Sequence, residues 1–168
     1  MKTDYDTIGQ TMIPDLIRSP TNPEHPAMVS KNPERPTTSV LLIDGNATDR
    51  AFYATGLKRC SPNYLILEAT DWQLGLALYR RSQRIDCVLL EFAMTDRSGF
   101  PFLVDLLPIP SRPNVAVIVL TTHFYRGLWE FATQNGAYGC FVKQYTSSEY
   151  LDKAIQCAVA HVGLMPKE

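Results

Sequence analysis

Three short runs of aliphatic residues recur along the chain, and each is followed by a segment with helical spacing. The runs are SVLLID at residues 39–44, DCVLLEF at 86–92 and VAVIVLTT at 115–122. Each has the length of one strand and lacks the polar alternation of a half-exposed strand, so each is expected to be buried on both faces of a sheet. The pattern therefore predicts a parallel sheet that is covered by helices.

Weaker patterns complete the alternation of strands and helices. A helix start is indicated by Asn46 or Thr48 as a cap, and another by Thr146 with Glu149, which resembles a capping box. Five strand–helix units joined by right-handed crossovers predict an α/β fold, a doubly wound five-stranded parallel sheet with helices on both faces. The other predicted elements are strands at 64–69 and 138–143 and helices at 47–60, 71–82, 99–109 (stopped by Pro108), 124–137 and from 147 onward.

The region before this alternation has a different composition. Six of the twelve prolines lie within the first 36 residues, and the stretch 19–38 has few apolar residues with which to build a core. We expect residues 1–38 to form a proline-rich tail that is largely disordered or that docks through Ile13, Leu16 and Ile17. The folded domain is expected at 39–163, followed by a short C-terminal tail at 164–168.

Bulk properties exclude several classes of function. A net charge of −1 provides no field for nucleic acid or for an anionic membrane. No apolar run reaches the ~20 residues of a membrane helix, and the N-terminus lacks the features of a secretory signal. The cysteines are far apart without metal-binding spacing, so we expect a reduced, cytoplasmic protein; they are Cys60, Cys87, Cys140 and Cys157.

Polar residues follow the predicted strands where each one ends. Asp44, Glu91, the pair Thr121 and Thr122, and Lys143 occupy four of these ends. Because sites in such sheets lie outside the carboxyl ends of the strands, these side chains are expected to converge. A plainer interpretation remains open, in which Asp44 only caps the next helix and Lys143 only neutralises the acids.

Four segments in this order resemble the receiver domain of two-component response regulators. They are LLIDGNATDR, VLLEFAMTDRSGF, VIVLTTH and GAYGCFVKQY, and the resemblance covers about residues 39–160. It implies the flavodoxin-like receiver fold. It also implies a site in which an aspartate accepts a phosphoryl group from a histidine kinase, two acids hold Mg²⁺, a hydroxyl contacts the phosphoryl oxygens and a lysine neutralises charge. Glu91 stands at the phosphoacceptor position, Asp44 at the first acid, Thr121 at the switch hydroxyl and Lys143 at the lysine.

Two departures from the family pattern affect the chemistry. Gly45 replaces the second acid, so we expect no cofactor and weak or absent Mg²⁺ binding, because a hard cation needs several oxygen ligands. Glu91 is longer than aspartate by ~1.5 Å, about one carbon–carbon bond. It can act as a constitutive substitute for the phosphorylated state, pairing with Lys143 and accepting a hydrogen bond from Thr121. The alternative is a decayed site in which Glu91 is simply tolerated.

Further departures concern the surroundings of the site. Thr122 replaces a small residue of the family and is expected to narrow access to the pocket. Cys140 stands at the switch aromatic position, while strand alternation directs Phe141 to the other face. Gln144 follows Lys143 where the family often has a cis proline, so we expect a trans bond there.

These observations predict a stand-alone atypical receiver that is not an enzyme and signals by protein–protein contact. Its partner is expected to be a histidine kinase, a photoreceptor or another signalling protein. A homodimer through the face of the fourth helix, fifth strand and fifth helix is a further option. One alternative is a phosphorelay receiver phosphorylated on Asp96, and a remote one is a flavodoxin-like flavin-binding protein. The expected contact face comprises the fourth helix, fifth strand and fifth helix, with Tyr125, Leu128, Trp129, Ala132, Tyr138, Tyr150 and Lys153.

Overall fold

The computed structural model describes residues 38–92 and 99–164. The predicted N-terminal tail, Asp96 and the end of the predicted C-terminal tail lie outside these residues. Within them, no helix combines the length and the apolar character needed to cross a membrane. The elements are β1 (Ser39–Ile43), α2 (Ala47–Cys60), β2 (Leu65–Ala69), α3 (Trp72–Arg81), β3 (Cys87–Phe92), α4 (Gly99–Leu106), β4 (Ala116–Thr121), α5 (Arg126–Gln134), β5 (Gly139–Val142), the 3₁₀ turn η2 (Lys143–Tyr145) and α6 (Ser148–Gly163).

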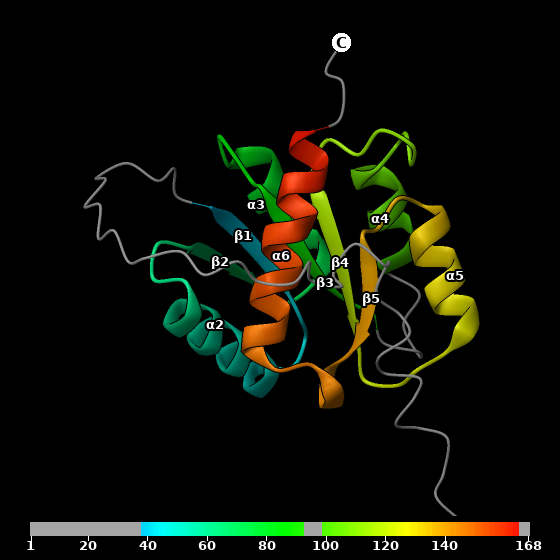
Figure 1. Cartoon of the computed structure of the whole chain (residues 1–168). Helices are drawn as coiled ribbons and strands as arrows, with labels where there is room; N and C mark the ends of the chain where they lie inside the picture. The colour runs from blue at the N-terminus through cyan, green and yellow to red at the C-terminus, as the bar shows by residue number, and fades with distance from the viewer. Residues whose placement is uncertain (1–37, 93–98, 165–168) are drawn as a thin grey trace, which may run out of the picture.

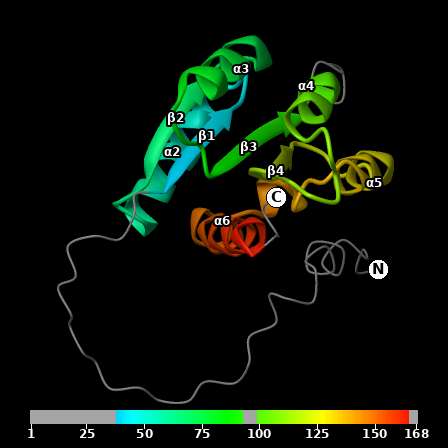
Figure 2. The same ribbon diagram turned by 90° about the horizontal axis from the view of Figure 1, so that it is seen from above.

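The five strands form one parallel sheet in the order β2-β1-β3-β4-β5. Helices α2 and α6 cover one face, and α3, α4 and α5 cover the other, as the two core clusters and the views in Figures 1 and 2 show. The predicted doubly wound α/β fold is confirmed. All strands run the same way, so their carboxyl ends meet at one edge of the sheet, toward the bottom of Figure 1.

Burial along the strands follows their position in the sheet. Every residue of β1 and β4 is buried, and β3 is buried except at Glu91. These are the three central strands, which explains why their sequences are continuous apolar runs. The edge strand β2 is more exposed, with Leu65 at 50% exposure.

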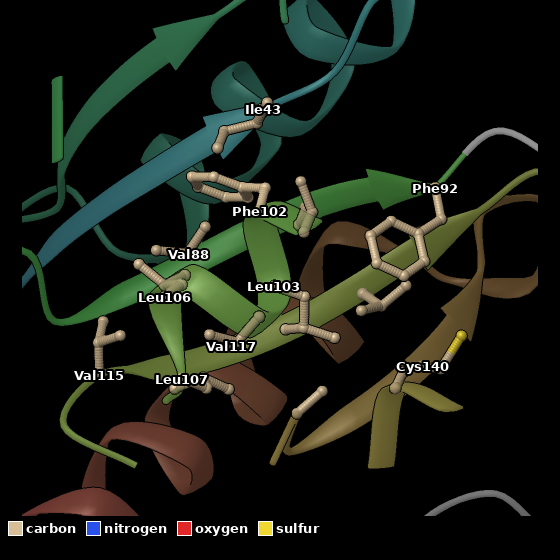
Figure 3. Close-up of a cluster of buried hydrophobic side chains, with 14 of the residues drawn as sticks. Ile43, Val88, Phe92, Phe102, Leu103, Leu106, Leu107, Val115, Val117 and Cys140 are labelled. Atoms are coloured by element: carbon tan, nitrogen blue, oxygen red, sulfur yellow. The ribbon is translucent and has the colours of Figure 1, made fainter. Parts of the chain in front are cut away.

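The core on the α3–α5 face is packed around α4. Phe102, Leu103, Leu106 and Leu107 of this segment are almost fully buried, and Figure 3 shows them lying on side chains of β3 and β4. Burying such a side chain contributes about 1.5–3 kcal/mol, so this helix is anchored by its apolar face. It ends at Leu106, earlier than the predicted 109, because Leu107 precedes Pro108 and that position disfavours helical geometry.

The caps of two helices fix the loops at the carboxyl edge. Asn46 caps α2, where its side chain accepts hydrogen bonds from the backbone N–H groups of Thr48 and Asp49. The cap of α6 is Ser147, which accepts from the N–H of Tyr150. The predicted cap Thr146 is therefore wrong by one residue. Its hydroxyl instead donates to the carbonyl of Val142, which closes the turn after β5.

Candidate functional site

A lysine and three carboxylates meet at the carboxyl edge of the sheet. The ammonium Nζ of Lys143 lies 2.6 Å from Oδ2 of Asp44, 2.7 Å from Oδ2 of Asp49 and 3.1 Å from Oε1 of Glu91. The Lys143 side chain is 9% exposed and that of Asp44 is fully buried. We call these four residues the lysine–carboxylate cluster.

Strand alternation explains why three of these side chains converge. In a strand, residues two positions apart point to the same face. The three strand-end residues each follow by two positions a residue in the core between the sheet and helices α2 and α6. These pairs are Leu42 with Asp44, Leu89 with Glu91, and Phe141 with Lys143.

Asp49 was not identified from the sequence. It lies in the first turn of α2, which begins directly after β1 at the same edge of the sheet. The cap Asn46 sets the direction of this turn, and the positive end of the helix dipole favours an acid there. An acid three residues after a strand-end cap is the signal that would have found it. The carboxylate missing at Gly45 is thus matched by one that approaches from the helix.

The backbone around Asp44 holds its carboxylate in place. Oδ1 accepts a hydrogen bond from the N–H of Asn46 at 2.8 Å, and Nη1 of Arg50 donates to the Asp44 carbonyl at 2.7 Å. Oδ2 accepts no hydrogen bond of good geometry, although the ammonium of Lys143 lies 2.6 Å away. The short distance decides the interaction, because an ion pair depends on separation more than on angle. Asp44 therefore serves Lys143 as a buried counter-ion.

Lys143 is also anchored through its main chain. The hydroxyl of the buried Tyr53 donates to the Lys143 carbonyl at 3.2 Å and lies 3.5 Å from the Thr146 carbonyl. Burial acts to lower the pKa of the ammonium, but the close carboxylates of Asp44, Asp49 and Glu91 outweigh it and raise the pKa above its ordinary value. The lysine therefore stays charged throughout the physiological pH range.

The two threonines after β4 lie in different environments. Thr121 is buried, and its hydroxyl donates to the carbonyl of His123 at 2.9 Å. A hydroxyl has one proton, so this bond leaves none for Glu91, contrary to the sequence expectation. Thr121 pairs with Phe92, which packs on the α3–α5 face, and this register turns Thr121 away from the face of the cluster. Thr122 is exposed.

Two expectations about β5 and the loop after it agree with the geometry. Cys140 packs in the core on the α3–α5 face and Phe141 in the core on the α2–α6 face. The described residues contain no cis peptide bond, so the bond between Lys143 and Gln144 is trans.

The residues expected at the contact face divide by burial. Tyr125 is 57% exposed and Lys153 is exposed, while Trp129, Tyr138 and Tyr150 are half-buried. Leu128 is 5% exposed and Ala132 is fully buried, so neither is available to a partner. These two form the inner stripe of α5, whose residues recur at helical spacing.

Comparison with known proteins identifies the family. The family model described as the response regulator receiver domain matches residues 40–156. The chain is 32% identical over 114 residues to the two-component response regulator-like protein APRR7 of Arabidopsis thaliana, which covers 67% of this chain and 15% of that protein. It is 25% identical over 132 residues to the Fimbriae Z protein of Escherichia coli K12, covering 78% of this chain and 60% of that protein. The chain thus spans less than two thirds of these relatives.

Solved structures show the same architecture. A receiver domain protein from Clostridium thermocellum superposes with a TM-score of 0.65 at 26% identity, covering 76% of this chain and 98% of that one. A CheY-like receiver domain protein from Methanospirillum hungatei has a TM-score of 0.65 at 17% identity, with the same coverage, and supports the fold alone. With the family model covering most of the described residues, this chain belongs to the response regulator receiver domain family of two-component signalling.

Proposed function

We propose that this receiver acts by protein–protein contact in a state that does not depend on phosphorylation, with Glu91 in place of the acceptor aspartate. The observation that carries the proposal is the ion pair between Glu91 and Lys143, with Oε1 3.1 Å from Nζ. Glu91 thereby places a permanent negative charge against the lysine. A carboxylate brings one charge where a phosphoryl group brings nearly two, so the substitution is partial.

Glu91 reproduces the charge of a phosphorylated site against Lys143, but not the contacts of the switch hydroxyl and the switch aromatic residue. The hydroxyl of Thr121 stays on the carbonyl of His123 and does not turn to the carboxylate. Cys140 offers no ring at the position of the switch aromatic. Glu91 is therefore best understood as a fixed charge that keeps Lys143 in place, and coupling through the hydroxyl and a ring is not needed for the proposed contact.

The cluster does not fit Mg²⁺ as the receiver family would hold it. Mg²⁺ requires near-octahedral oxygen ligands at ~2.0–2.1 Å, several of them waters. Here Oδ1 of Asp44 accepts from the Asn46 N–H, and one oxygen of each carboxylate is turned toward the ammonium. Among the residues that the structure describes, no group of three or more His, Cys, Asp and Glu side chains is arranged to hold a metal ion. We infer that Lys143 is the internal counter-ion of this site.

Exposed aromatic side chains favour partner contact at the same edge. In the described part of the chain, the aromatic residues that are most exposed all lie on elements at the carboxyl end of the sheet. Aromatic residues are enriched at protein interfaces, where they add large buried areas. The exposed aromatic residues are Phe52 of α2 (57% exposed), Phe124 and Tyr125 before α5 (42% and 57%) and Tyr145 of η2 (60%). The class of partner that we propose for them is another signalling protein, such as a histidine kinase.

A phosphorylation assay tests the central part of the proposal. The chain is incubated with radiolabelled acetyl phosphate and Mg²⁺, and we expect no label on the wild-type protein. The double variant Gly45→Asp with Glu91→Asp restores both acids, and a Cβ at Gly45 has room because its nearest neighbour is the Thr70 carbonyl at 3.7 Å. Label on this variant shows that the assay works. Label on wild type that disappears with Asp96→Ala would support the phosphorelay alternative instead.

The role of the charge is tested by binding to a partner captured from the native host. Glu91→Gln keeps the shape and removes the charge, and we expect at least a tenfold loss of affinity, because Lys143 loses one of its three carboxylate partners. Tyr145→Ala should weaken the same complex, while Leu164→Ala, at an exposed residue remote from this edge, is the control. Unchanged binding by Glu91→Gln would favour the decayed-site alternative.

A further inference from the structure

A cavity lies at the end of the sheet opposite the lysine–carboxylate cluster. It has a volume of about 230 Å³ and is lined mostly by apolar atoms. Its walls come from the loop between α4 and β4, the start of β4, the turn between α5 and β5, and the last turns of α6. The lining includes Pro110, Val117, Thr133, Ala137, Tyr138 and Val162.

The backbone fixes the walls of this cavity. The N–H of Tyr138 donates to the carbonyl of Val117 at 2.7 Å, and the ladder between β4 and β5 continues from Ile118, so the wall on that side is held by backbone hydrogen bonds. Gly136 has a φ of 89°, and a Cβ there would lie 2.9 Å from the Cα of Pro110. The two loops therefore pack backbone to backbone, and the cavity is preformed.

The volume and lining indicate the kind of occupant. A cavity of about 150 Å³ holds a benzene molecule, and sites for small-molecule ligands typically start near 300 Å³, so this one suits one or two aliphatic side chains. The polar side chains of the lining are already engaged, since the hydroxyl of Thr133 donates to the carbonyl of Trp129 and the ring of His161 packs against that of Tyr138. An aliphatic peptide segment therefore fits the chemistry better than a polar ligand does.

The chain's own N-terminal segment enters the domain at this end. Ser39 begins β1, and the N–H of Asp86 donates to its carbonyl. The N–H of Ala116, which lines the cavity, donates in turn to the Asp86 carbonyl. The entry point and the cavity wall are thus two strand spacings apart, about 10 Å.

The largest group of aliphatic residues before Ser39 lies at positions 12–17, and a shorter run, Ala27 to Val29, lies nearer to the domain. Met12, Ile13, Leu16 and Ile17 fall within six positions, in a stretch that is otherwise mostly polar. About 20 residues separate Ile17 from Ser39, and five of them are prolines, so the composition favours an extended linker with a reach of up to about 60 Å at ~3.1 Å per residue. The tether can therefore place the segment at the cavity.

We propose that residues 12–17 dock in the cavity at the amino end of the sheet. Tethering on this scale gives an effective concentration in the millimolar range, so a contact with a dissociation constant of about 0.1 mM is filled about ten to one. The docked segment covers an apolar opening and shortens the free part of the N-terminal region. Docking at this end leaves the lysine–carboxylate cluster and the exposed aromatic residues free for a partner.

Limited proteolysis of the full chain tests this proposal. Trypsin can cleave after Arg18, next to the docking residues, and after Lys31, which lies nearer to the domain. We expect cleavage after Arg18 to be about tenfold slower in the wild-type chain than in Val162→Asp, which puts a charge into the cavity wall. Cleavage after Lys31 should be equal in both proteins. Ile13→Asp should release Arg18 to the same extent without altering the folded domain.

Val104→Asp is the matched control, because Val104 is an apolar residue 45% exposed on α4 and is not part of the cavity. It should behave as the wild type. Equal cleavage after Arg18 in the wild type and both release variants would overturn the proposal. Protection that grows with protein concentration would also overturn it, because the occupant would then belong to a second copy.

Discussion

The two ends of the sheet are built in opposite ways. At the carboxyl end, Lys143 is held by three carboxylates, and one of these, Asp44, is fully buried. At the amino end, apolar side chains surround a cavity of about 230 Å³. Stability at the first end depends on charges that must remain paired, whereas stability at the second is limited by empty space.

This difference follows from how the chain crosses the sheet. Because the strands are parallel, their last residues all lie at the carboxyl end of the sheet. Polar residues that are far apart in the sequence therefore meet there. The amino end is reached by loops of unequal length, and the cavity lies where two of them pack beside the start of β4. Substitutions that break the lysine–carboxylate cluster should therefore lower the free energy of unfolding, whereas substitutions that fill the cavity should raise it. The following experiments test this difference.

The largest effect is expected from Lys143→Met. The variant leaves Asp44, Asp49 and Glu91 together without a cation, and removing one partner of a buried ion pair typically costs about 3 to 5 kcal/mol. Urea denaturation at neutral pH measures the free energy of unfolding. Lys153→Met, on the exposed surface of α6, should change it by less than about 0.5 kcal/mol. Equal effects at the two lysines would mean that the cluster contributes no special stability.

A smaller loss is expected where α2 crosses α6. A Cβ at Gly56 would lie 2.5 Å from the Cβ of the buried Ser148, so Gly56→Ala must push the helices apart. Overpacking of this kind costs about 1 to 3 kcal/mol, which exceeds the helix propensity gained. Gly163→Ala, at the open end of α6, has no neighbour within 4 Å and should not be destabilising. Thermal denaturation of both variants checks the difference.

The sequence predicted the fold and most of the cluster for a specific reason. Continuous apolar runs identify the buried strands, and Asp44, Glu91 and Lys143 follow from where those runs end. Asp49 could not be found this way, since its position depends on the geometry with which α2 starts at Asn46. The bond of Thr121 to His123 depends on the loop after β4, and the cavity depends on how two loops pack. Neither is encoded in local periodicity.

The dependence of stability on alkaline pH tests the backbone anchor of the cluster. Burial raises the pKa of Tyr53 to about 12, whereas an unfolded tyrosine ionises near 10. Between these two pKa values, the folded state keeps a proton that the unfolded state loses. The contribution of the Tyr53 hydroxyl to the free energy of unfolding is therefore fully present below pH ~10 and is lost between about pH 10 and 12. Tyr53→Phe should be about 1 kcal/mol less stable at pH 8, because the Lys143 carbonyl loses its donor.

The gap between wild type and Tyr53→Phe should then narrow as the pH rises. The limiting slope for one proton is about 1.4 kcal/mol per pH unit, and urea titrations between pH 8 and 11 measure it. The raised pKa of Lys143 acts in the same direction in both proteins and cancels in the comparison. A constant gap across this range would show that Tyr53 ionises as it does in the unfolded chain.

The smallest effect is expected at the amino end of the sheet, where the substitution should raise the free energy of unfolding instead of lowering it. Ala137 is 7% exposed and lines the cavity, so Ala137→Val adds two methyl carbons where space exists. Cavity filling of this size commonly adds about 0.5 to 1 kcal/mol. The gain should appear equally in the full chain and in Ile13→Asp if the added carbons only improve core packing. It should be smaller in the full chain if they displace residues 12–17, because that chain then loses a contact while it gains one. A loss of stability in both backgrounds would show that the amino end is already closely packed, and the contrast between the two ends would then fail.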